Sequence, residues 1–280
     1  MTSPPLCQIA FSVTDLNRTR GWYREAFGFL PAGGTHLFRG PLTARVQGLP
    51  RAASTCRWLV DSQDFFQLEM FQFSSPRARP MPPDRRLCDT GYGMVGLHVA
   101  DLDATLARLG RLGTAPITRP VGNPGARRVC VRDPEGVLLE LMEDDPRRPG
   151  AAARPRPEVP VTARFVTATV PDLARSRRFF VDVLGLEPAQ GVELHGSEHE
   201  ALWELEGARR DALVLWAGDL LVELVQYADP PGRPWPRRQA CRWRSPAASS
   251  EPTRRTCWAR PPACATRMAT PSAWARWASI

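Results

Sequence analysis

The 280-residue sequence contains no apolar run that approaches the length of about 18 residues needed for a membrane span. Its first residues lack the basic and apolar regions of a secretory signal. The seven cysteines are odd in number and include no Cys-x-x-Cys pair, so neither a disulfide framework nor a structural zinc site is indicated. These absences predict a soluble cytoplasmic protein without a membrane partner.

The main body of the chain also lacks net charge, although the whole chain carries +8. Residues 237–280 contain nine arginines and one acidic residue, whereas residues 1–236 contain 28 arginines and 28 acidic residues. Because the excess of positive charge lies in the C-terminal segment, a basic groove is not a property of the folded body. Nucleic acid is therefore not expected as a partner.

The segment 237–280 has no leucine, valine, glycine, phenylalanine, tyrosine, aspartate or asparagine, but it has four tryptophans and three cysteines. One explanation is a reading-frame shift near residue 237, which would replace the original continuation by out-of-frame translation. The alternative is a natural Arg/Trp tail that binds nucleic acid or a membrane. In either case the composition predicts a disordered tail.

A short phrase, Val-x-Asp-Leu, occurs three times before that segment, beginning at Val13, Val99 and Val170. Each copy ends a strand-like alternation of apolar and polar residues, and its aspartate is placed to cap a helix. Each is followed by an apolar strand with one glutamate. Such recurrence indicates one supersecondary unit used several times. The three glutamates are Glu69, Glu140 and Glu223.

The units have the order β-α-β-β-β, which predicts an α+β fold. Two units, at 5–73 and 92–145, would form a first domain over residues 4–145. Residues 146–162 contain many prolines and arginines and predict a linker. A third unit at 163–236 would be part of a second domain.

The third unit repeats the first at an offset of 154 residues, because Glu69 and the prolines after it recur as Glu223 and the prolines after it. After Pro82 the chain continues into another unit, whereas after Pro236 it does not. We therefore expect the third unit to lack a partner. Its exposed sheet edge would favour a homodimer or aggregation.

Tandem β-α-β-β-β units with this phrase and this glutamate strand resemble the vicinal oxygen chelate superfamily, which includes glyoxalase I, bleomycin-resistance proteins and extradiol dioxygenases. The resemblance covers residues 5–145 as a complete pair and 164–236 as a partial one. It implies that two units pair into a cup-shaped mixed sheet around a cavity, and that the first and last strands of each unit supply metal ligands.

For the first pair, the resemblance implies the metal ligands Gln8, Glu69 and Glu140, with Met94 at the fourth ligand position. Carboxylate and amide oxygens suit a hard divalent ion such as Mg²⁺, Mn²⁺ or Ni²⁺, whereas a thioether is a soft ligand that would contribute little. Iron and zinc are further candidates for the bound ion, and a protein without any metal is the alternative. Glu140 and Glu69 are also the candidate catalytic groups for proton transfer. The structural alternative is that these glutamates pair with arginines or lie at an exposed edge.

Two side chains are expected to contact a substrate. His98 lies on the same strand face as Met94, about 13 Å along the strand, so it is expected to line the cavity rather than bind the same metal. An interior hydrogen-bonded histidine is the alternative. Phe71, in an aromatic-rich strand, is the second expected substrate contact.

In the partial pair, Glu223 would be a remnant of the equivalent site, because Phe165 at the first-strand position cannot bind a metal. His195 and His199 have the spacing of a two-histidine helix face, but Gly196 interrupts that helix and the His-Glu-x-x-His order is missing. The pattern therefore does not favour a metal site at these histidines.

Two functions stay open. The first is a metal-dependent lyase, isomerase or dioxygenase-type enzyme acting on a small oxygenated substrate. The second is a metal-free protein of the bleomycin-resistance type, which binds a small drug-like molecule in an apolar cavity. Whether the protein is an enzyme is not decided by the sequence.

Overall fold

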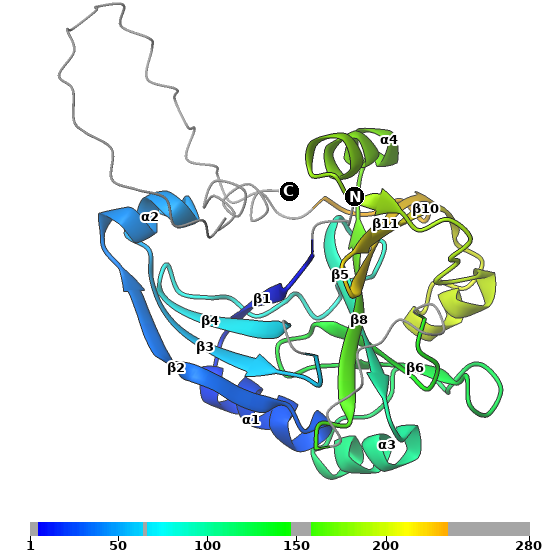
Figure 1. The fold of residues 1–280 in the computed structure, drawn as a ribbon, viewed down its shortest axis with the longest axis horizontal. Helices are drawn as coiled ribbons and strands as arrows, with labels where there is room; N and C mark the ends of the chain where they lie inside the picture. Colours follow the sequence, from blue (N-terminus) through cyan, green and yellow to red (C-terminus); the bar gives the residue numbers. More distant parts are fainter. Residues whose placement is uncertain (1–4, 64–65, 147–157, 235–280) are drawn as a thin grey trace, which may run out of the picture.

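The computed structural model describes residues 5–63, 66–146 and 158–234, and it contains two mixed β-sheets with helices against them (Figure 1). One sheet has the strand order β1-β4-β3-β2, and the other has the order β6-β7-β5-β8-β11-β10-β9. The predicted α+β class is confirmed. The predictions made for the segment 237–280 lie outside the described residues, as does most of the expected linker.

The first unit forms the four-stranded sheet, and β1 lies parallel to β4 at one edge of it. Its elements are β1 (Gln8–Val13), α1 (Leu16–Phe27), β2 (Leu30–Arg39), α2 (Pro41–Gln47), β3 (Ala53–Val60) and β4 (Gln67–Ser75).

The second unit has three strands where four were predicted. The segment 113–127, between its helix and its second strand, contains three prolines and three glycines, which are poor strand formers. The turn at Asp133 is as expected, since the amide of Gly136 donates to the Asp133 carbonyl at 3.0 Å. The elements are β5 (Gly91–Val99), α3 (Leu102–Arg111), β6 (Arg128–Arg132) and β7 (Leu138–Met142).

The third unit adds its strands to the same sheet as the second. Its α-helix continues directly into a π-helix, and a 3₁₀-helix precedes its last two long strands. The elements are β8 (Val161–Thr169), α4 (Leu173–Arg177), η1 (Arg178–Val183), β9 (Glu187–Pro188), η2 (Ser197–Trp203), β10 (Arg209–Ala217) and β11 (Leu220–Asp229).

The aspartate of each repeated phrase caps the helix that follows it. Asp15, Asp101 and Asp172 each accept a hydrogen bond from the backbone amide three residues later, at 3.0, 2.8 and 2.8 Å. Side-chain caps of this kind satisfy amides that have no partner within the helix. Gln72 and Gln226 contribute a second such bond to α1 and α4. The repeated phrase is thus confirmed as a strand end followed by a helix start.

The pairing of the units differs from the expected one. β5 lies antiparallel to β8, so the second unit pairs with the third and not with the first. All nine residues of β8 are buried, which is typical of a strand covered on both faces in the middle of a sheet, whereas β1 keeps several half-exposed residues. The expectation of an unpaired third unit is therefore wrong, and β1 of the first unit is an edge strand of the smaller sheet. Residues 4–145 do not form a sheet of their own.

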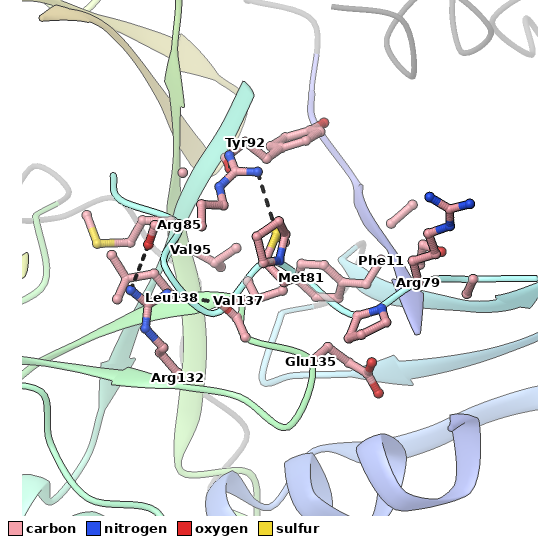
Figure 2. A pocket seen from close by; sticks show the side chains of 18 of the residues that line it. Phe11, Arg79, Met81, Arg85, Tyr92, Val95, Arg132, Glu135, Val137 and Leu138 are labelled. Atoms are coloured by element: carbon pink, nitrogen blue, oxygen red, sulfur yellow. Dashed lines mark hydrogen bonds between the residues drawn. The ribbon is translucent and has the colours of Figure 1, made fainter. Parts of the chain in front are cut away.

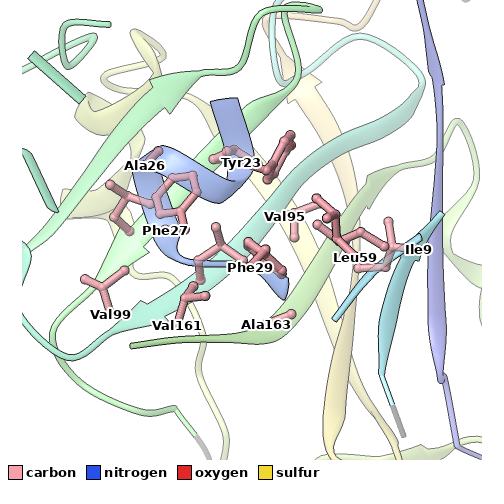
Figure 3. Packing of buried hydrophobic residues seen from close by; sticks show 14 of the residues in the cluster. Ile9, Tyr23, Ala26, Phe27, Phe29, Leu59, Val95, Val99, Val161 and Ala163 are labelled. Atoms are coloured by element: carbon pink, nitrogen blue, oxygen red, sulfur yellow. The ribbon is translucent and has the colours of Figure 1, made fainter. Parts of the chain in front are cut away.

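The first unit packs against the second through side chains instead of strand pairing. Tyr23, Phe27 and Phe29 form a buried aromatic group that shares one core with Val95 and Val161 of the larger sheet (Figure 3). α1 and α3 lie side by side (Figure 1), and Arg108 of α3 donates to the carbonyl of Ala26 at 2.9 Å. No helix of the described part of the chain is both long and apolar enough to cross a membrane.

Candidate functional site

The structure does not bring the four predicted metal-site residues together. Gln8 and Glu69 lie on β1 and β4 of the smaller sheet, whereas Met94 and Glu140 lie on β5 and β7 of the larger one. The separation follows from the pairing of β5 with β8, because this leaves the first unit's sheet without a partner sheet.

In the smaller sheet, Glu69 faces its neighbours on β3. Its carboxylate accepts hydrogen bonds from Trp58 Nε1 at 3.1 Å and from Cys56 Sγ at 3.2 Å. Burial raises the pKa of Glu69, and these two bonds oppose the rise. Gln8 lies opposite Gln67, two residues away from Ala10, the residue opposite Glu69. Gln8 and Glu69 offer few oxygen ligands compared with the six or more that a hard divalent ion takes.

The larger sheet brings together Glu140 and Glu223, the two glutamates that the sequence assigns to different domains. His195 lies between them. Its Nε2 is 3.1 Å from Glu140 Oε2, and its Nδ1 is 2.9 Å from Glu223 Oε2. All three side chains are buried, with His195 only 5% exposed. The antiparallel pairing of β5 with β8 causes this meeting, because it sets β7 and β11 on either side of the paired first strands.

The geometry suits a protonated imidazole. Both ring nitrogens lie against carboxylate groups, and a protonated imidazole can donate a hydrogen bond from each nitrogen. Burial lowers the pKa of His195, but the charges of Glu223 and Glu140 outweigh burial and raise it to about 9. Burial raises the pKa of Glu223, but His195 and Arg210 outweigh this and hold it below its ordinary value.

Two arginines complete this buried ion network. Arg128 Nη1 lies 3.3 Å from Glu140 Oε1, and Arg210 Nη1 lies 3.6 Å from Glu223 Oε1. The arginine pairing that the sequence left open for the glutamates is thus present for both. A hollow of about 690 Å³, lined in part by β10, reaches Glu223 and Arg210, which form an ion pair with each other.

Apolar and aromatic side chains fill the rest of this face. The rings of Phe165 and Trp203 lie edge-on to His195 at centroid distances of 5.2 and 5.1 Å. Leu194 and Trp203 are buried, and they hold the segment that carries His195 against the sheet. Gly96 is essential for this packing, since a Cβ there would lie 1.9 Å from the Phe165 ring.

These residues do not fit the metal site that the resemblance implies. Met94 offers a thioether that lies 3.9 Å from Cys130 Sγ in the apolar core, and Phe165 has no donor atom. The imidazole of His195 already occupies the space between the two carboxylates. Across the described residues, no group of three or more histidine, cysteine, aspartate or glutamate side chains is arranged to hold a metal ion.

The two predicted substrate contacts lie elsewhere. His98 on β5 is half-buried, and burial lowers its pKa, while Asp145 opposes this. Phe71 packs against Phe38 and Phe73 on the smaller sheet, at ring distances of 5.6 and 5.9 Å. Neither His98 nor Phe71 lines the hollows described for this protein. Their roles stay predictions.

A hollow of about 650 Å³ lies between the first and second units (Figure 2). Its walls are β1, the start of β5, the turn before β7 and the proline-rich segment 76–87. Most of the lining is apolar, including Phe11, Met81, Val95 and Leu138. Sequence reasoning missed this hollow because it depends on how the first unit packs against the second.

The architecture has counterparts among known proteins. Residues 6–141 match the family model described as the Glyoxalase/Bleomycin resistance protein/Dioxygenase superfamily. No curated protein sequence gives a significant match. Glyoxalase I from Zea mays is 18% identical, with a TM-score of 0.51, and the alignment covers 81% of this chain and 69% of that enzyme. A glyoxalase family protein from Bacillus cereus is 21% identical, with a TM-score of 0.45, over 49% of this chain and 92% of that protein.

At such identities the maize structure shows a shared fold and not a shared activity. The family-model match, the repeated units and the fold agree with one another. Residues 6–141 belong to the Glyoxalase/Bleomycin resistance protein/Dioxygenase superfamily.

Proposed function

We propose that the protein binds a small molecule, without a metal ion, in the 650 Å³ hollow between its first and second units. The observation that carries this proposal is a hollow of the size typical of ligand pockets, about 300–1,000 Å³, with a mostly apolar lining. Phe11 and Met81 offer the kind of surface on which an apolar ligand packs. This function corresponds to the metal-free alternative left open by the sequence.

The chemistry of the donor groups favours binding over metal-assisted catalysis. A metal that polarises substrate oxygens needs ligand atoms, and Met94 and Phe165 stand where such atoms would be required. Glu140 and Glu223 already pair with His195, Arg128 and Arg210. Lyase, isomerase and dioxygenase-type activities therefore stay predictions.

A fluorescence titration with a neutral apolar dye, N-phenylnaphthylamine, tests the proposal. Ala78 lies in the segment that forms one wall of the hollow, so Ala78→Trp should fill the space and weaken dye binding at least about tenfold, a loss of about 1.4 kcal/mol. Ala107→Trp, on the exposed side of α3, is the control and should bind as the unaltered protein does.

Equal dye binding by Ala78→Trp and Ala107→Trp would show that the hollow is not the binding site. Metal analysis of the same preparation adds a second criterion. Stoichiometric divalent metal that is lost on Glu140→Ala would contradict metal-free binding and would favour the enzyme.

A further inference from the structure

We infer that the ligand of this hollow is an organic anion, with a carboxylate or sulfonate group on an apolar body. This inference rests on the proposed function, because it names the chemical class that the same hollow selects. The observation behind it is the charge of the lining, which contains five arginines and one acidic residue. The arginines are Arg77, Arg79, Arg85, Arg86 and Arg132.

The single acidic residue, Glu135, does not neutralise these arginines because its carboxylate is held by the first unit. It accepts hydrogen bonds from the Thr14 amide at 2.8 Å and from Thr19 Oγ1 at 2.6 Å, and it pairs with Arg18 at 2.8 Å. Arg18 does not line the hollow. The negative charge of Glu135 is thus compensated at the start of α1. Arg86 pairs with Asp89 at 3.5 Å, so the positive charge available to a ligand comes chiefly from the other arginines, Arg132 above all.

Arg132 is the arginine best placed to hold an anion. It is half-buried at the end of β6, and the hydrogen bonds described for its guanidinium go to the main-chain carbonyls of Arg85 at 3.0 Å and Gly136 at 3.2 Å (Figure 2). Within the described residues no carboxylate lies within 4.0 Å of it. An arginine has five N–H donors, so donors remain for an anionic ligand.

The remaining lining decides what the anion is attached to. Phe11, Val95, Val137 and Leu138 cover the hollow between the arginines. A small inorganic anion would leave this apolar surface wet, whereas an aromatic or aliphatic body would bury it and gain about 25 cal/mol for each Å². Arginines with apolar side chains between them therefore select an amphipathic anion.

Two dyes with the same ring system test the inference. Anilinonaphthalene sulfonate carries a negative charge, and N-phenylnaphthylamine is the same framework without it. The full chain should bind the sulfonate at least about tenfold more tightly than the neutral dye, and added salt should weaken only the sulfonate.

Arg132→Gln should weaken sulfonate binding by about tenfold to a hundredfold, the value of a charge-assisted hydrogen bond, and should leave the neutral dye unchanged. Arg111→Gln, on exposed α3 outside the hollow, is the matched control. Should Arg132→Gln fail to fold, as judged by circular dichroism, the exposed Arg79→Gln at the same hollow provides the test through a smaller loss of the same sign.

The outcomes separate the two proposals. If both dyes bind equally well and neither arginine variant affects the sulfonate, the anionic class is wrong while binding in the hollow stands. If neither dye binds, or if Ala78→Trp leaves both dyes bound, the proposed function itself is wrong.

Discussion

Replacing His195 by glutamine should destabilise the protein strongly, because it removes the cation between two buried carboxylates. Glu140 and Glu223 are 0% and 1% exposed, so water cannot take over the role of the imidazolium. Removing one partner of a buried ion pair costs about 3–5 kcal/mol. The Arg128 and Arg210 contacts remain in the variant, which places the expected loss near the lower end of this range.

The loss should depend on pH with a definite sign. The pKa of His195 is raised from 6.5 to about 9, so the folded state binds this proton more tightly than the unfolded state. The stabilisation is therefore complete below about pH 6.5 and is lost as the pH rises through 9. At about 1.4 kcal/mol per pH unit, the pH-dependent part amounts to about 3 kcal/mol.

Urea unfolding of the two proteins at pH 6 and at pH 9.5 measures this effect. The difference in unfolding free energy should be about 3–4 kcal/mol at pH 6 and should shrink by about 3 kcal/mol at pH 9.5. His36→Gln, at an exposed histidine on β2, should change stability little at either pH. A difference for His195→Gln that does not shrink with rising pH would refute a charged imidazole at this position.

Three further predictions follow from the packing of the units. Gly96→Ala places a methyl group 1.9 Å from the Phe165 ring and should lower the free energy of urea unfolding by about 1–3 kcal/mol. The double variant that also carries Phe165→Leu should recover this stability, and a double variant without recovery would contradict the steric cause. Glu135→Gln weakens the bonds that hold the β6–β7 turn on α1 and should cost about 1.5–3 kcal/mol, seen also as faster proteolysis between the first and second units. A fragment of residues 1–146, which the sequence presents as one domain, should aggregate in size-exclusion chromatography because β5 loses β8; a stable monomer would show that the β5–β8 pairing is dispensable.

The local features of the fold were predictable from short patterns. The phrase beginning at Val13, Val99 and Val170 fixes a strand end and a helix start, because an aspartate next to a helix has one strongly preferred role. The turn at Asp133 is equally local. The second unit's missing strand was also readable in principle, since prolines and glycines between 113 and 127 disfavour a strand.

The candidate site was only partly predictable. Glu140 and Glu223 stand out as single acidic residues in apolar strands, and the sequence identifies both. Their meeting at one site could not be predicted, because unit pairing depends on contacts between residues far apart in the chain. His195 lies in a segment without regular secondary structure, so the residue pattern does not indicate which side chains it contacts. Its place between the carboxylates is therefore a result of tertiary packing alone.

The sequence by itself determined the repeated unit, the α+β class and the family, since these depend on patterns within tens of residues. Only the tertiary structure decided which units pair, that β1 stays at an edge, and that an imidazole lies between Glu140 and Glu223. The physical reason is that β8 is buried on both faces and needs a neighbouring strand on each side, and β5 supplies one of these neighbours. The hollow lined by five arginines is a consequence of that choice, because it forms where the first unit packs on the second without joining its sheet.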